Sequence, residues 1–214
     1  MSAVPIRVML ADDHAVVRMG FRLLLEGSSD MKVVAEAESG EEALKRYAEV
    51  KPDVLVLDIS MPGIGGLETL SRLLAKEADA RVLMLSAHED TMHPKRALKA
   101  GALGYLSKRS AAEELIQAIR QVYQRKTFIE PAIAHQMAVQ QLSGDRNPVE
   151  VLSDKEFKVF LALAKGESVL EIAEILHLSP RTVGTHLYNI KQKLAASNQA
   201  DLAIIAIRNG LIEP

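Results

Sequence analysis

Residues 54–58 read Val-Leu-Val-Leu-Asp, a run of apolar residues that ends in a carboxylate. A continuous apolar run of this length predicts a strand that is covered on both faces, as in parallel sheets. Such a sheet needs helices above and below it, so the surrounding chain should alternate between strands and amphipathic helices. Asp58 is then expected at the carboxyl end of a central strand.

Residues 1–124 follow that alternation. Further strands are expected at residues 6–11, 32–37, 81–85 and 103–106. Helices are expected at residues 14–26, 41–50, 67–78 and 110–123 and within 91–100. This pattern predicts an α/β, flavodoxin-like domain with a five-stranded parallel sheet in the strand order 2-1-3-4-5.

The remainder of the chain has a different pattern. Residues 125–147 are interpreted as a linker with helical character at 129–142, followed by a turn-rich stretch that runs from Ser143 to Pro148. Residues 148–214 predict a second, all-α domain of four helices, at about 153–165, 169–177, 179–194 and 198–209. Ser153 with Glu156 forms a capping-box pattern, and Ser179-Pro180 opens the third of these helices. Gly166 and Gly210 are expected to end the first and the last.

Composition excludes several classes of protein. The 214 residues include 26 Lys plus Arg and 28 Asp plus Glu, with 48% hydrophobic and 25% charged residues, which is ordinary globular composition. The absence of cysteine excludes a disulfide scaffold, a thiolate zinc site and a cysteine nucleophile. Neither a secretory signal nor an apolar run of about 18 residues is found, so a soluble cytoplasmic protein is expected.

Polar side chains follow four of the expected strands. Asp12 and Asp13 follow the first strand, Asp58 the third, Ser86 the fourth and Lys108 the fifth. The carboxyl ends of parallel strands meet at one edge of the sheet, where ligands bind in open α/β folds. Three carboxylates in one pocket would repel one another, and a hard cation relieves that repulsion. Mg²⁺ suits two carboxylates with a backbone carbonyl.

The same residues fit phosphoryl transfer. Lys108 supplies a fixed positive charge and Ser86 a hydroxyl donor for phosphate oxygens, and catalysis of this reaction depends mostly on such charge stabilisation and positioning. Asp58 is the expected acceptor and would become an acyl phosphate. Asp12 and Asp13 are better placed to support the metal.

Other interpretations of these acids stay open. A single aspartate at a strand end is most often a helix cap or loop residue, and Asp13 alone could cap the first helix. A Mg²⁺-dependent phosphohydrolase is possible, although such an enzyme normally has a second carboxylate as general acid, and here Ser60 follows Asp58 by two residues. A flavin or nucleotide site is less favoured, because the first strand is not followed by a glycine-rich phosphate loop.

The strand-end residues belong to a larger set of motifs that resembles the receiver domain of response regulators. The resemblance covers about residues 5–122 and is carried by Asp12-Asp13, Asp58-Ile59-Ser60-Met61-Pro62-Gly63, Gly65-Gly66, Ser86-Ala87, Lys99-Ala100-Gly101-Ala102, Gly104-Tyr105 and Lys108. It implies that a histidine kinase phosphorylates Asp58, and that the protein is a regulator that promotes only its own phosphoryl transfer and dephosphorylation.

The resemblance also implies roles for the other site residues. Mg²⁺ would be bound by Asp12, Asp13, Asp58 and the backbone carbonyl of Ser60. Ser86 and Tyr105 would be the switch pair, and Lys108 would contact the phosphate. Two positions depart from the family pattern: Arg109 stands where proline is frequent, and Pro94 is expected to shorten or shift the helix within residues 91–100.

The third helix of the second domain is locally basic. Residues 179–194 contain Arg181, Lys191 and Lys193 and no acid, within a region (148–214) of net charge −1. A basic helix that follows a short helix and a tight turn indicates a helix-turn-helix that binds DNA. A helical bundle that contacts proteins, with a merely solvated basic face, is the alternative.

The second domain resembles the LuxR-type helix-turn-helix. The resemblance is carried by Leu152-Ser153-Asp154-Lys155-Glu156, Gly166, Glu171-Ile172-Ala173, Leu178-Ser179-Pro180-Arg181-Thr182-Val183, His186, Lys193-Leu194 and Gly210-Leu211-Ile212. Both domains together are similar to the NarL/FixJ class of two-component response regulators, and most to its GacA/UvrY subgroup. Membership implies binding to double-stranded promoter DNA and a homodimer when phosphorylated or DNA-bound.

The resemblance places the DNA contacts on the third helix. Gly184, Thr185, Tyr188 and Asn189 occupy positions that face bases in the family. Phosphate contacts are expected from Arg181, Thr182, Lys191 and Lys193. Gly184 departs from the larger polar residue usual at its position and lowers helix propensity by about 1 kcal/mol relative to alanine.

Overall fold

The computed structural model describes residues 4–87, 90–110, 112–142, 148–209 and 211–212. The chain divides after Ala134 into two compact units, and each is considered by itself. The predicted turn at Ser143–Asn147 and the predicted helix stop at Gly210 lie outside the described residues. None of the described helices is long and apolar enough to cross a membrane.

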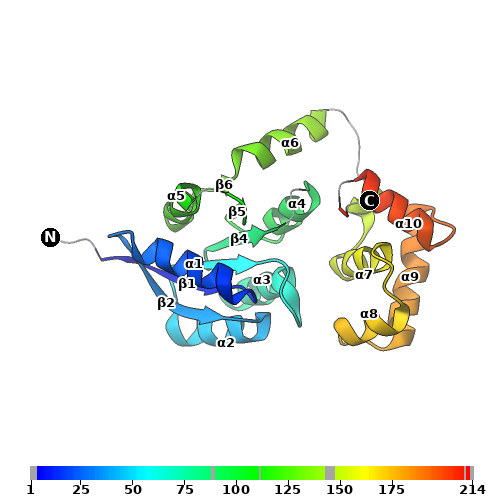
Figure 1. Cartoon of the computed structure of the whole chain (residues 1–214), viewed down its shortest axis with the longest axis horizontal. Coiled ribbons are helices and arrows are strands. Elements are labelled where there is room, and N and C mark those ends of the chain that lie inside the picture. Colours follow the sequence, from blue (N-terminus) through cyan, green and yellow to red (C-terminus); the bar gives the residue numbers. More distant parts are fainter. Residues whose placement is uncertain (1–3, 88–89, 111, 143–147, 210, 213–214) are drawn as a thin grey trace. The chain divides into compact units, whose positions relative to one another are not determined.

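The first unit contains a fully parallel sheet in the order β2-β1-β3-β4-β5-β6 (Figure 1). Its strands are β1 (Ile6–Ala11), β2 (Met31–Ala37), β3 (Val54–Asp58), β4 (Val82–Ser86), β5 (Gly104–Ser107) and β6 (Phe128–Ile129). The predicted order of the first five strands is confirmed. The predicted number is wrong by one, because the sheet continues into β6. Two residues are too few to show a period in the sequence, and β6 falls where the linker was expected.

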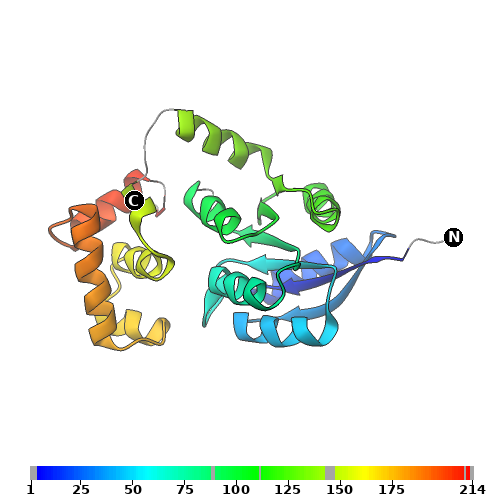
Figure 2. The same ribbon diagram turned by 180° about the vertical axis from the view of Figure 1, so that it is seen from behind.

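Five helices connect the six strands of the sheet and cover it on two sides (Figures 1 and 2). They are α1 (Ala15–Glu26), α2 (Gly40–Val50), α3 (Gly65–Lys76), α4 (Met92–Lys99) and α5 (Ala112–Tyr123). Each lies within about three residues of its expected position. Lys51, in the left-handed conformation at φ 41°, ends α2 before Pro52.

Pro94 does not disrupt α4. It is the third residue of the helix, which spans eight residues. In the first turn a backbone N–H has no partner within the helix, so proline removes no helical hydrogen bond there. Gly101, at φ 101°, follows Ala100, the C-cap residue of α4.

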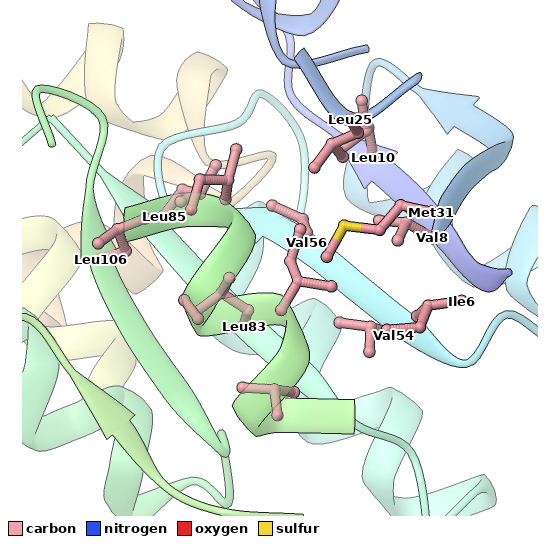
Figure 3. Packing of buried hydrophobic residues seen from close by; sticks show 14 of the residues in the cluster. Ile6, Val8, Leu10, Leu25, Met31, Val54, Val56, Leu83, Leu85 and Leu106 are labelled. Carbon is pink, nitrogen blue, oxygen red and sulfur yellow. The ribbon is translucent and has the colours of Figure 1, made fainter. Parts of the chain in front are cut away.

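The core explains why residues 54–57 are continuously apolar. Val54 and Val56 pack in a buried cluster with residues of β1, β4 and α5 (Figure 3). Leu55 and Leu57 alternate with them and are also fully buried. Successive side chains of a strand point to opposite faces of the sheet, so a strand that is covered on both sides needs apolar residues at every position.

The second unit is all-α. It contains a short 3₁₀ helix (Pro148–Val151) and the helices α7 (Asp154–Ala164), α8 (Val169–Ile175), α9 (Pro180–Leu194) and α10 (Gln199–Arg208). The four predicted helices are confirmed. The predicted capping box of Ser153 and Glu156 is present, and the Ser179 side chain accepts from the Thr182 N–H with Pro180 at the first helical position.

The segment between the expected domains is structured where it is described. After β6, α6 (Pro131–Leu142) confirms the helical character expected for residues 129–142. β6 pairs in parallel with β5, Gly104 opposite Phe128 and Tyr105 opposite Ile129. The start of the expected linker is therefore part of the first unit, whereas the boundaries 1–124, 125–147 and 148–214 stay a prediction.

We predict that Gly66→Ala destabilises the first unit by about 1–3 kcal/mol, the usual cost of overpacking. A Cβ at Gly66 would meet the Asp58 carbonyl oxygen and lie 2.7 Å from the Cα of Ile59, both of them backbone atoms. This clash outweighs the roughly 1 kcal/mol that alanine contributes in a helix. Urea unfolding followed by tyrosine fluorescence measures the effect, because three of the four tyrosines lie in the first unit.

Gly20→Ala is the matched control. Gly20 lies within α1, and a Cβ there would contact nothing within 4 Å. This variant should gain about 0.5–1 kcal/mol. Equal effects of the two substitutions would contradict the close approach of α3 to β3.

Candidate functional site

The carboxylates expected at the strand ends lie together. Asp58 is the last residue of β3, and Asp12 follows β1, its neighbour in the sheet, where Ala11 pairs with Leu57. Ligand atoms of Asp12, Asp13, His14 and Asp58 all lie within 4.8 Å of one another. The pairing of β1 with β3 thus creates the acidic pocket that the sequence predicts.

Asp58 is fully buried and has a partner on each oxygen. Its Oδ1 accepts a hydrogen bond from the Ser60 backbone N–H at 3.0 Å, and its Oδ2 lies 2.8 Å from the Lys108 ammonium. The same ammonium lies 2.8 Å from Oδ2 of Asp12, which is also buried. Lys108 therefore holds a single positive charge against two carboxylates, as expected from its place after β5.

Burial dominates the acid–base properties of the pocket. It raises the pKa of Asp58, and the negative charge of Asp12 adds to this, while Lys108 and the Ser60 N–H oppose it. Burial would lower the pKa of Lys108, but hydrogen bonds to Asp12 and Asp58 outweigh it and the pKa is raised. The lysine is therefore charged at neutral pH, and burial disfavours the ionised form of Asp58.

Ser86 and Tyr105 are both fully buried on neighbouring strands. Ser86 ends β4, and Tyr105 lies on β5, where Met84 is its partner in the sheet. Burial raises the pKa of the Tyr105 hydroxyl, and the Ser86 side chain opposes this effect. The structure thus brings the two expected switch residues together, with the aromatic ring turned inward.

Two residues of the pocket were not anticipated from the sequence. His14 donates its backbone N–H to Asp12 at 2.8 Å, and its ring Nδ1 lies 2.8 Å from Oδ1 of Asp13. Arg18, almost fully buried, donates to the Asp12 carbonyl at 2.6 Å and pairs with Glu36. In the sequence, Arg18 is a charged residue among the apolar residues of α1. Periodicity alone assigns such a residue to the surface, so its burial was not predicted.

The helix-cap interpretation of Asp13 is not supported. The N-cap position of α1 is taken by His14, whose side chain makes no capping hydrogen bond. The donor set around Asp12, Asp13 and Asp58 is composed mainly of carboxylate oxygens, and such ligands suit a hard divalent cation. The residues present therefore fit Mg²⁺. Ser60 is exposed beside the pocket, which agrees with access to its carbonyl.

All eight expected DNA-contacting residues lie on α9. Arg181, Thr182, Thr185, Tyr188 and Lys193 are exposed, and Gly184, Asn189 and Lys191 are half-buried. Val183 and Ile190 of the same helix are fully buried, so the helix is fixed in the unit by its opposite side. A Cβ at Gly184 would contact nothing within 4 Å, so internal packing does not require glycine there.

Two of the three basic residues expected at phosphates have partners within the unit. The Lys193 ammonium lies 2.6 Å from Oε2 of Glu156, the residue that completes the capping box of α7. The Lys191 ammonium donates to the Ser197 carbonyl at 3.2 Å. Lys193 is thus part of the packing of α9 against α7, a role that the charge pattern of the sequence did not indicate.

Both units match known protein families. Residues 8–120 match the family described as the response regulator receiver domain. Residues 150–206 match the family described as bacterial regulatory proteins of the luxR family.

Known proteins are similar over nearly the whole chain. The response regulator GacA of Pseudomonas viridiflava is 40% identical over 210 residues, which cover 97% of this chain and 98% of that protein. The response regulator UvrY of Escherichia coli K12 is 42% identical over 208 residues, 96% of this chain and 95% of that one. RcsB of Salmonella enterica serovar Typhimurium, solved on the promoter rprA with the phosphomimetic BeF₃⁻, shares the fold with a TM-score of 0.73 at 24% identity, over 94% of this chain and 98% of that one.

We predict that Asp58→Asn stabilises the protein at pH 7 by roughly 1 kcal/mol. Because burial raises the pKa of Asp58, the fold favours its protonated form. The stability that this preference provides is present below the unfolded pKa of about 3.9 and is lost as the pH rises through the folded pKa. The gain in the urea midpoint of the variant should therefore shrink as the pH is lowered toward about 4.

The matched control is Asp79→Asn, which removes a carboxylate whose side chain is 92% exposed. Surface substitutions of this kind change stability by less than about 0.5 kcal/mol. A loss of stability in Asp58→Asn would show that pairing with Lys108 outweighs the cost of burying the charge.

Proposed function

Because the chain belongs to the response regulator family and joins a receiver domain to a LuxR-type DNA-binding domain, we propose that phosphorylation of Asp58 by a histidine kinase switches its binding to promoter DNA. The observation that carries the proposal is the Lys108 ammonium 2.8 Å from the buried Asp58 carboxylate. The Lys108 ammonium opposes the effect of burial by favouring the ionised form of Asp58, and it presents a positive charge where phosphoryl oxygens would arrive.

The proposed transfer uses groups that the site already holds in position. One Asp58 oxygen attacks the phosphorus of a phosphohistidine, the P–N bond breaks, and its electron pair stays on the imidazole nitrogen, which takes up a proton. Lys108 stabilises the charge on the phosphoryl group, and Ser86 supplies a hydroxyl one residue beyond Leu85, the partner of Asp58 in the sheet.

Asp12, Asp13, Asp58 and the Ser60 carbonyl would hold the Mg²⁺ ion of the proposed reaction. Bound there, the ion would neutralise charge on the phosphoryl oxygens and on the acidic cluster. Arg18 and His14 hold Asp12 in place: Arg18 donates to the Asp12 backbone carbonyl, and the His14 N–H donates to the Asp12 carboxylate. These contacts hold Asp12 in position within the acidic cluster.

For the second unit, we propose that α9 enters the major groove, with Arg181 and Lys191 at phosphates and Thr185, Tyr188 and Asn189 at bases. Asn189 can make paired hydrogen bonds to adenine, and Tyr188 has an exposed ring 65% accessible. The RcsB structure contains promoter DNA, which supports this use of the shared fold. We propose that the protein binds a two-fold symmetric DNA site as a homodimer in the cytoplasm.

We predict that the protein gains one phosphoryl group when incubated with Mg²⁺ and acetyl phosphate, because Asp58 is the carboxylate with the lysine beside it. Intact-mass spectrometry detects the adduct, and hydroxylamine should remove it, as expected for an acyl phosphate. Asp58→Asn should gain nothing, whereas Asp79→Asn, which keeps the pocket, should match the wild type. An adduct on Asp58→Asn would move the acceptor elsewhere, and release of phosphate in many turnovers would indicate a phosphohydrolase.

We predict that Arg181→Ala weakens binding of the phosphorylated protein to a random-sequence DNA duplex and reduces the slope of log K against log salt by about one. Fluorescence anisotropy across a range of salt concentrations measures both. Lys165→Ala removes an equal charge from the end of α7 and should leave the slope unchanged. Equal slopes for wild type and Arg181→Ala would place this residue away from the phosphates.

A further inference from the structure

Glu130 joins the loop that carries Lys108 to the segment that leaves the receiver. Its Oε2 accepts a hydrogen bond from the Ser107 backbone N–H at 2.8 Å and another from the Ser110 hydroxyl at 2.6 Å. These two donors stand on either side of Lys108 in the chain. Glu130 itself lies beyond residues 8–120, the part of the chain that matches the receiver family.

The backbone of Glu130 is also bonded in two directions. Its N–H donates to the Tyr105 carbonyl at 3.2 Å, and its carbonyl accepts from the Ala134 N–H, in the first turn of α6, at 2.9 Å. The preceding strand, β6, pairs with β5, and its Phe128 N–H donates to the carbonyl of Leu103, the residue before β5. Glu130 is therefore connected at once to β5, to the Lys108 loop and to α6.

The loop is held from two sides. Toward the acidic pocket, the Lys108 N–H donates to the Ser86 carbonyl at 2.8 Å, and the ammonium reaches Asp12 and Asp58. On the other side, Ser107 and Ser110 are bonded to the Glu130 carboxylate. Hydrogen bonds to a charged acceptor are about twice as strong as neutral ones, so this attachment resists displacement of the loop.

We infer that Glu130 is a positioning residue for Lys108 and transmits the state of the acidic pocket to α6. The inference rests on the proposed function, because it takes a phosphoryl group on Asp58 as the change that displaces Lys108. A displacement of Lys108 moves Ser107 and Ser110, and Glu130 moves with them because it is bonded to both. Since the Glu130 carbonyl begins α6, the helix start differs between the two states. Coupling between two sites is reciprocal, so the helix start also affects the pocket.

Hydrogen exchange of the full-length protein with and without beryllofluoride and Mg²⁺ tests the transmission. In the wild type, the ligand should change exchange at residues 104–110 and at 128–142. In Glu130→Ala, the response at 104–110 should remain and the response at 128–142 should be lost. Glu130→Gln should keep part of it, because the amide oxygen still accepts the Ser107 N–H.

The rate of Asp58 phosphorylation by acetyl phosphate tests the positioning. We expect the phosphorylation rate to fall about tenfold in Glu130→Ala, the size of effect usual when a residue that orients a ligand-contacting side chain is removed. The fall should be smaller in Glu130→Gln. Glu113→Ala removes an exposed carboxylate near the same loop, at the start of α5, and should change neither readout. Ser110→Ala removes one of the two hydrogen bonds to the Glu130 carboxylate and should give a smaller effect in the same direction. This variant replaces Glu130→Ala in the test if Glu130→Ala does not fold.

The outcomes separate the two proposals. A purely structural Glu130 would give faster exchange in α6 in both states of Glu130→Ala, with the response to beryllofluoride preserved, and this would overturn the inference while leaving the proposed function intact. An unchanged phosphorylation rate would overturn the positioning role. A wild type that neither gains phosphate nor responds at residues 104–110 would overturn the proposed function and the inference together.

Discussion

A single ammonium group, that of Lys108, lies between two buried carboxylates, and the first unit is arranged to hold it there. Asp12 and Asp58 are brought side by side by the pairing of β1 with β3, and both are buried. Removing the lysine would leave two uncompensated buried charges, a far larger penalty than loss of a surface ion pair. The pocket therefore depends on the position of the Lys108 loop, and any group that moves this loop changes the charge balance at Asp58.

The sequence predicted the elements that have a periodic pattern of apolar residues. Apolar runs and helical faces located β1 to β5 and α1 to α5. The polar residues after four of these strands located the pocket, because parallel strands present their carboxyl ends together. Single contacts that join distant segments were missed. Arg18 reaches the Asp12 carbonyl from within an amphipathic helix, and β6 is a two-residue strand without a period, so neither has a sequence pattern of its own.

The second unit shows a limit of charge patterns. Arg181 and Lys193 look equivalent in the sequence, as two basic residues on one helix that contains no acid. In the structure, Arg181 is exposed in the first turn of α9, whereas Lys193 pairs with Glu156, which caps α7 thirty-seven residues earlier. Glu156 is buried, and its partner offsets part of the cost of burying it. A basic residue can thus serve packing or DNA, and only its tertiary partner distinguishes the two.

The inferred transmission from the acidic pocket to α6 through Glu130 depends on the register of β6 against β5. Tyr105 pairs with Ile129, so the next residue of the segment lies level with the end of β5, within reach of the Ser107 N–H. A slip of one residue would turn the Glu130 side chain to the opposite face of the sheet and break both of its bonds to the loop. Two residues of strand contribute little to stability, yet they fix this register. The short strand therefore matters for the alignment of one carboxylate with the Lys108 loop more than for the strength of the sheet.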